Sequence, residues 1–115
     1  MRVKILKSAL NDLSEGSRFY DRQEQGLGAY FLDTLFSDID CLQLYAGIHT
    51  QQFGTFHRML SKRFPFAIYY EREQDTATVY AVLDCRRNPA WIRKLLGGRR
   101  VKKTIVRQRP LSDRR

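Results

Sequence analysis

The stretch Phe56–Pro89 reads FHRMLSKRFPFAIYY, then the polar break EREQDTA, then TVYAVLDCRRNP. Both flanking segments are rich in the β-branched and aromatic residues that favour strands. Gln74 and Asp75 in the break predict a turn, so we expect the two segments to pair as an antiparallel hairpin. This hairpin is the part of the chain that decides the fold.

Basic residues stand toward the outer ends of the hairpin: Arg58, Lys62, Arg63, Arg86 and Arg87. Pairing would gather them at one end of a sheet. We read Phe56–Arg63 as a strand, on which Arg58 and Lys62 share a face. Arg63 takes the opposite face unless a bulge near Pro65 re-aims it, because Pro65 marks a strand start, an edge or a bulge.

The segments before the hairpin predict one strand and two helices. Alternation over Arg2–Leu6 is typical of a half-buried strand. Ser8 is a candidate N-cap for a helix that runs to about Gln25. A second helix is expected from about Leu27 to Tyr45, with a buried stripe at Phe31, Leu35, Ile39 and Leu42. Its acidic residues, Asp33, Asp38 and Asp40, are expected on a solvated face.

A short helix should follow the hairpin. Asn88 is a candidate N-cap with Pro89 at the first helical position, and Gly97-Gly98 is expected to end the helix. We therefore divide the chain into a folded domain at 1–96 and a basic, flexible tail at 97–115. A short ordered piece is expected in that tail around Ile105-Val106.

The order of elements predicts an α+β fold. An N-terminal strand joins an antiparallel sheet, two antiparallel helices pack on one face of it, and a short C-terminal helix and a basic tail follow. The 115 residues suit one domain. No apolar run suits a signal peptide or a membrane span, so we expect a cytoplasmic protein without membrane association.

Charge and cysteine content narrow the classes of function. The net charge of +9 suggests an anionic partner. Most of it lies in residues 96–115, which carry 8 Lys and Arg against 1 Asp. Cys41 and Cys85 make neither a disulfide framework nor a zinc site, so we expect small buried thiols, no metal and no cofactor.

The sequence resembles the RelE/ParE superfamily, the toxins of type II toxin–antitoxin modules and plasmid stabilisation systems. The resemblance covers about residues 1–96. It rests on Ala9–Leu13, Phe19-Tyr20, Gly26-Leu27-Gly28, Phe31-Leu32, Arg58, Arg63-Phe64-Pro65-Phe66 with Ile68 and Tyr70, Val79–Val82, Arg86-Arg87-Asn88-Pro89 and Trp91. The Arg-Phe-Pro-Phe run and the later Arg-Arg-x-Pro-x-Trp pattern are the most specific parts.

The resemblance implies a growth-arresting toxin held inactive by an antitoxin that folds around it. RelE-like members cleave mRNA on the ribosome, whereas ParE-like members inhibit DNA gyrase without catalysis. We expect ribosome-dependent mRNA cleavage. Gyrase inhibition and a degenerate, non-toxic binding module are the alternatives.

Metal-independent RNA cleavage needs cations near the scissile phosphate and groups that move protons. The family places nuclease residues on the sheet, so we assign Arg63, Arg87 and Lys62 as candidate catalytic residues. The alternative interpretation is that these residues are solvated strand ends or that they contact the antitoxin. Candidate RNA-binding residues are Arg58, Arg86, Arg99, Arg100, Lys102 and Lys103.

The two histidines, His49 and His57, are expected to be structural, because neither follows the last strand of the hairpin. Tyr80 is expected in the core. Asp84 is placed to pair with the neighbouring arginines. The sequence thus supplies cations for a phosphate but no evident proton carrier.

Overall fold

A computed structural model describes residues 1–101 and 105–109. The elements, in chain order, are β1 (Arg2–Leu6), α1 (Lys7–Gln23), α2 (Leu27–Asp40), α3 (Leu42–Tyr45), β2 (Gln51–Gln52), β3 (Phe56–Leu60), β4 (Phe66–Glu73), β5 (Thr76–Asp84), α4 (Pro89–Val101) and β6 (Ile105–Arg109). The predicted α+β class is confirmed. Within the described residues, no helix is both long and apolar enough to cross a bilayer.

Among the described residues, the sheet has six strands in the order β2-β3-β4-β5-β1-β6. The predicted hairpin is β4–β5, with Gln74 at the turn in a left-handed conformation of φ 54°. All neighbouring strands are antiparallel except β1 and β5, which run parallel. A parallel pair needs a long crossover, and the helices and strands between β1 and β5 provide it.

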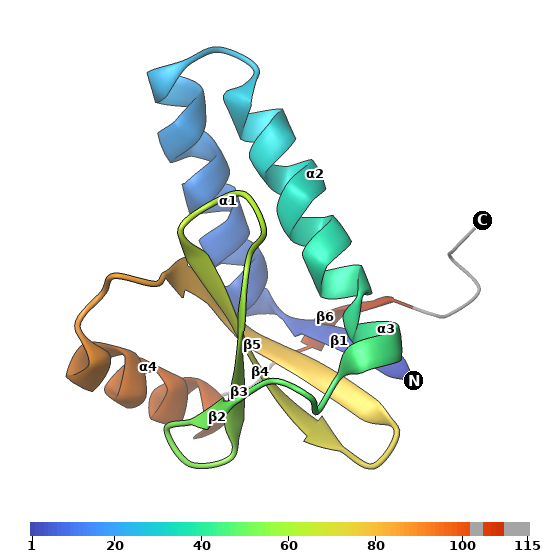
Figure 1. Ribbon diagram of the computed structural model, residues 1–115. Helices are drawn as coiled ribbons and strands as arrows, with labels where there is room; N and C mark the ends of the chain where they lie inside the picture. Colours follow the sequence, from blue (N-terminus) through green and yellow to red (C-terminus); the bar gives the residue numbers. More distant parts are fainter. Residues whose placement is uncertain (102–104, 110–115) are drawn as a thin grey trace.

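Helices α1 and α2 lie side by side as an antiparallel pair that covers the sheet (Figure 1). Gly26, at φ 91°, makes the tight link between them. The predicted apolar stripe of α2 is confirmed, since Phe31, Leu35 and Ile39 are fully buried and Leu42 continues the stripe into α3. Gly28 lets the helices approach, because a Cβ there would lie 2.5 Å from the Ser17 carbonyl oxygen.

Several helix boundaries differ from the expectation. The single helix expected from about Leu27 to Tyr45 is divided at Cys41 into α2 and α3. Helix α1 begins at Lys7 directly after β1, with Leu6 rather than Ser8 at the N-cap and no side-chain cap. It ends at Gln23. Helix α4 has the predicted cap, in which Asn88 Oδ1 accepts hydrogen bonds from the backbone N–H groups of Ala90 (2.8 Å) and Trp91 (3.2 Å).

The expectation that Gly97-Gly98 ends the last helix is wrong, because α4 continues to Val101. Neither glycine adopts a positive φ that would break the helix, and Arg99 beyond them is anchored in the protein interior. Residues 97–101 are therefore helical. Further along the chain, β6 pairs antiparallel with β1, including Ile105, the residue expected to begin a short ordered piece.

Candidate functional site

The sheet register brings Arg63, Arg86 and Arg87 to one end of the sheet, whereas Arg58 lies within β3. Leu60 pairs with Ala67, and Phe66 pairs with Asp84, so β3 ends where β4 begins and β5 ends. The Cys85 N–H donates to the Pro65 carbonyl oxygen at 2.9 Å. We call this place, with the exposed residues Arg63, Arg86 and Arg87, the arginine end.

The loop that carries Lys62 and Arg63 is anchored on both sides. The expected strand from Phe56 to Arg63 is shorter in the structure, because β3 ends at Leu60. Lys62 therefore lies in the loop after β3 and does not share a strand face with Arg58. Asp38 accepts hydrogen bonds from Ser61 Oγ at 2.8 Å and from the Lys62 N–H at 3.4 Å. The expected solvated position of Asp38 is wrong: it is 4% exposed and serves this loop.

Phe64 anchors the other side of the loop. Its ring contacts Tyr20 and Phe31 edge-on at centroid distances of 4.8 and 5.1 Å. Arg63 lies between this anchor and the one at Asp38, with its own side chain exposed. The loop therefore holds Arg63 at a defined position on the surface.

Arg86 and Arg87 follow β5 and have different partners. Arg86 donates to both oxygens of Asp84, from Nε at 2.9 Å and from a terminal nitrogen at 2.6 Å, as the sequence predicted. This hydrogen bonding lowers the pKa of Asp84 below its usual value. The Arg87 guanidinium instead lies 4.5 Å from the ring centre of Trp91, so a cation–π contact orients it.

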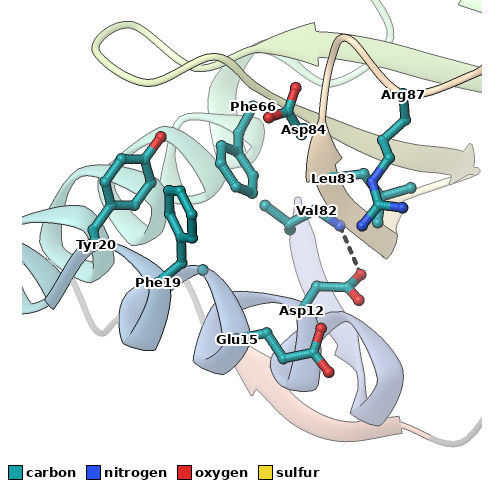
Figure 2. A pocket seen from close by; sticks show the side chains of 10 residues that line it. Asp12, Glu15, Phe19, Tyr20, Phe66, Val82, Leu83, Asp84 and Arg87 are labelled. Atoms are coloured by element: carbon teal, nitrogen blue, oxygen red, sulfur yellow. Dashed lines mark hydrogen bonds between the residues drawn. The ribbon is translucent and has the colours of Figure 1, made fainter. Parts of the chain in front are cut away.

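A hollow of about 250 Å³ lies between α1 and the end of β5, and Arg87 is on its rim (Figure 2). We call it the α1–β5 hollow. Its lining residues are Asp12, Glu15, Gly16, Phe19, Tyr20, Phe66, Val82, Leu83, Asp84 and Arg87. Sequence reasoning missed Glu15, Phe19 and Tyr20 as site residues, although Glu15 and Phe19 are four apart on one helix and so share a face.

Glu15 and Tyr20 add groups that can carry protons. Glu15 is an exposed carboxylate on α1, the helix that also carries Phe19 and Tyr20 (Figure 2). Burial raises the pKa of the Tyr20 hydroxyl, and the negative charge of Asp84 raises it further. The hydroxyl therefore stays protonated at neutral pH and can donate a hydrogen bond.

Arg99 has a different environment from the exposed arginines. Its guanidinium binds both oxygens of Asp12, at 2.5 and 3.0 Å, and donates to the Tyr80 carbonyl oxygen at 2.9 Å. Asp12 also accepts the Val82 N–H at 3.0 Å. Strand β1 pairs with β5 only as far as Val79, so these two side chains satisfy backbone groups of β5 beyond the end of β1. Arg99 was expected to bind RNA, but in the structure its guanidinium is bound by Asp12 and by the backbone of β5.

The other candidate RNA-binding residues are dispersed. Arg100 forms an ion pair with Glu71, donates to Thr55 Oγ1 and lies over the ring of Phe56 at 4.6 Å. Arg58 is half-buried, and its Nε lies 3.4 Å from the hydroxyl of Tyr69. Lys102 and Lys103 lie outside the described residues.

The histidines are part of a partly buried polar cluster, in keeping with the structural role expected for them. The His57 ring stacks on Tyr70 at 5.0 Å, and its Nδ1 lies 2.8 Å from the His49 carbonyl oxygen. His49 Nδ1 lies 2.5 Å from the Tyr70 hydroxyl. Burial lowers the pKa of His49, and the nearby His57 lowers it further, so His49 is neutral at pH 7. Tyr80 is in the core at 1% exposure.

Both cysteines are free and half-buried, and no group of three or more His, Cys, Asp or Glu within the described ranges is arranged to hold a metal ion. The side chains of the arginine end and of the adjoining hollow offer three kinds of chemistry. Guanidinium groups can bind an oxyanion, an aromatic wall can stack a base, and a carboxylate and a phenol can exchange protons.

Comparison with known proteins supports the fold. No protein-family model and no curated protein matches the sequence. A solved structure described as "Chromosomal ParDE TA system from P. aeruginosa" contains a chain that matches with a TM-score of 0.68 and 14% identity. The match covers 73% of this chain and 95% of that one. The two chains share a fold. The architecture that the RelE/ParE resemblance implied is therefore confirmed.

Proposed function

We propose that the protein is the toxin component of a toxin–antitoxin module and that it cleaves mRNA on the ribosome. The observation that carries the proposal is the arginine end, where Arg87 borders a hollow that also contains an exposed carboxylate and a protonated phenol. The fold shared with a chain of a ParDE toxin–antitoxin system supports the assignment to a toxin–antitoxin module. The arginine end supports the proposed cleavage reaction.

The proposed reaction uses the ribose 2′-OH as nucleophile. Glu15 takes the 2′-OH proton while the 2′-oxygen bonds to phosphorus, and the bond from phosphorus to the 5′-oxygen breaks. Tyr20 donates its proton to that leaving oxygen. The products are a 2′,3′-cyclic phosphate and a 5′-hydroxyl, and proton exchange with water restores both side chains. Arg63 and Arg87 stabilise the negative charge that develops on the phosphate.

The test is cleavage of mRNA on programmed ribosomes by purified protein. The double substitution Arg63→Ala with Arg87→Ala should abolish cutting. Glu15→Gln should slow it by about 10²–10⁴-fold, the usual contribution of a general base. Arg72→Ala is the matched control, because Arg72 is an exposed arginine on β4 near the opposite end of the hairpin. Cutting that survives the double substitution contradicts the assignment.

Gyrase inhibition is the second candidate, and the fold shared with a ParDE chain favours it. In that case the arginine end would be a binding surface without chemistry. Purified protein would then leave mRNA intact on ribosomes and block supercoiling by gyrase. Inducible expression with translation and supercoiling followed in parallel separates the two candidates, and unchanged growth would indicate a non-toxic binding module.

The proposed partner is a cognate antitoxin. A toxin with a net charge of +9 suits an acidic binding segment. Co-expression with the product of a neighbouring short reading frame should restore growth and yield a complex on size-exclusion chromatography. If none of the proteins encoded by neighbouring short reading frames binds this chain, the assignment to a toxin–antitoxin module is contradicted.

A further inference from the structure

We propose that a second hollow, between α1 and α4, binds the base on the 5′ side of the scissile phosphate, with adenine as the preferred base. Trp91 stacks on the base, and Asn11 contacts its edge. We call the site the α1–α4 hollow. The inference rests on the proposed function, because it takes single-stranded mRNA as the ligand, and it adds sequence specificity to the reaction.

The α1–α4 hollow lies between one face of each helix. Ser8, Asn11 and Glu15 line it from α1, where spacings of three and four residues place them on one face. Trp91 and Leu95, four residues apart, line it from α4. Its volume is about 290 Å³, close to the lower end of the range usual for small-molecule sites, about 300–1,000 Å³. The hollow therefore suits a ligand the size of one base.

Trp91 gives the hollow an aromatic wall. The residue is 40% exposed, whereas Ile92 and Leu96 of the same helix are buried in the core. The Trp91 N–H donates to Asn88 Oδ1 at 3.2 Å, so the end of the helix that carries the ring is fixed. Unpaired bases stack on exposed aromatic side chains in RNA-binding proteins. Trp91 is therefore suited to hold a base in the hollow.

Arg87 connects the base site to the phosphate site. It lines both hollows, and its guanidinium lies 4.5 Å from the ring centre of Trp91. A guanidinium stacks through its face and donates hydrogen bonds from its edge. The ion pairs in the described part of the chain do not involve Arg87. Its donors therefore remain available for a phosphate while a base stacks on the part of the Trp91 ring that Arg87 leaves uncovered.

Glu15 relates the base site to the ribose. It also lines both hollows, and in the proposed reaction it takes the proton of the 2′-OH. The attacking 2′-OH belongs to the nucleotide on the 5′ side of the scissile phosphate, and its ribose joins the base to that phosphate. A nucleotide with its base at Trp91 and its phosphate at Arg87 therefore spans the two hollows with its ribose near Glu15. Asp12, the other acidic residue of the lining, is already paired with Arg99.

Asn11 supplies the groups that contact the edge of the base. It is exposed on the α1 side of the hollow, and the half-buried Ser8 lies one turn before it. A side-chain amide has one donor group and one acceptor, which match N7 and the N6 amino group of adenine. Hypoxanthine has an oxygen in place of that amino group, so the Asn11 oxygen would face a second acceptor. The chemistry of Asn11 therefore favours adenine over hypoxanthine.

The first test uses the fluorescence of the full chain, because Trp91 is its single tryptophan. The probe is a short deoxyribose-phosphate chain of abasic residues with one central adenine. It lacks a 2′-OH, so the proposed reaction cannot cut it. We expect this probe to quench Trp91 emission and the same chain without a base to leave the emission unchanged. No quenching by the adenine probe, or equal quenching by the base-free chain, overturns the proposal.

Variants of Trp91 test the stacking contact, with binding followed by the anisotropy of labelled probes. Trp91→Ala should weaken binding of the adenine probe by about fivefold or more, the usual contribution of one stacked base, and Trp91→Phe should restore most of it. Circular dichroism verifies that each variant is folded. An equal loss with the base-free chain would mean that Trp91 acts only through Arg87, and it would contradict stacking.

A variant of Asn11 tests the contact with the edge of the base. The wild type should prefer the adenine probe to a hypoxanthine probe by about fivefold or more, and Asn11→Ala should remove the preference. Ser14→Ala is the control, because Ser14 is an exposed polar residue on α1 outside the lining of the hollow. Equal binding of both probes by the wild type, or an equal change in Ser14→Ala, contradicts the role of Asn11.

Cleavage of mRNA on programmed ribosomes separates this inference from the proposed function. The wild type should cut after adenosine more often than after other nucleotides, and Asn11→Ala should reduce that preference. If the wild type binds the adenine probe as expected but cuts no mRNA, the proposed reaction fails and the base site remains. If it cuts mRNA and Asn11→Ala leaves the preference unchanged, the base site fails and the proposed reaction remains.

Discussion

Two arginine–aspartate pairs, Arg99–Asp12 and Arg86–Asp84, have nearly the same length and different consequences. The nearest nitrogen–oxygen distances are 2.5 and 2.6 Å. The side chains of the first pair are 18% and 8% exposed, and those of the second 72% and 28%. The first pair satisfies backbone groups of β5, whereas the second faces solvent. Burial and additional partners therefore determine whether an arginine contributes to the fold or remains accessible to a ligand.

The largest expected effect is that of Asp12→Ala. It leaves the Arg99 guanidinium enclosed without its counter-charge and the Val82 N–H without its acceptor. We expect the free energy of unfolding to fall by about 3–5 kcal/mol, as for other broken buried pairs. Urea unfolding followed by circular dichroism measures it. A loss no larger than that of Asp84→Ala would remove the distinction between the two pairs.

A smaller effect in the opposite direction is expected from Gly97→Ala and Gly98→Ala. Both glycines lie inside α4, and an added Cβ meets no atom within 4 Å. Each substitution should raise the free energy of unfolding by about 0.5–1 kcal/mol, because alanine is the better helix former. The same unfolding assay applies. Destabilisation by either variant would mean that α4 does not continue through this segment to Arg99.

The two aspartates should titrate on opposite sides of 3.8, the ordinary aspartate pKa. Burial raises the pKa of Asp12 despite Arg99, so its contribution to stability falls as the pH rises from 3.8 through its folded pKa. Arg86 lowers the pKa of Asp84, so that contribution is present above 3.8 and is lost as the pH falls through its folded pKa. NMR titration of the side-chain carboxyl carbons measures both midpoints. Two midpoints on the same side of 3.8 would contradict the comparison.

The smallest expected effect is that of Arg86→Ala on stability. The Arg86 side chain is largely exposed, and solvent screens its pairing with Asp84. The unfolding midpoint should stay within the error of measurement, both at low and at high salt. A clear, salt-dependent loss of stability would show that this pair also holds the fold, and Arg72→Ala is the matched control for removal of an exposed arginine.

Local patterns predicted much of the architecture. The apolar stripe of α2, the β4–β5 hairpin and the Asn88 cap all depend on residues near one another in sequence, and all are confirmed. The gathering of Arg63, Arg86 and Arg87 at one end of the sheet follows from the hairpin register. For these features, periodicity and cap chemistry carry sufficient information.

The predictions that were wrong or missing share a different cause. Asp38 was expected in solvent because it lies off the apolar stripe, yet it is buried beneath the loop at Ser61, 23 residues further along the chain. Glu15 and Tyr20 were not linked to Arg87, because the α1–β5 hollow forms only when α1 packs against β5. Such contacts leave no periodic signal in the sequence.

The sequence by itself determined the order of helices and strands, the apolar faces that pack them and the basic character of the chain, because these depend on local propensity and composition. Only the tertiary structure decided which charges stay accessible. Asp12 and Arg99 are 87 residues apart and meet where β1 ends beside β5. Whether an arginine is enclosed there or exposed at the arginine end depends on the packing of α4, which local sequence signals did not predict.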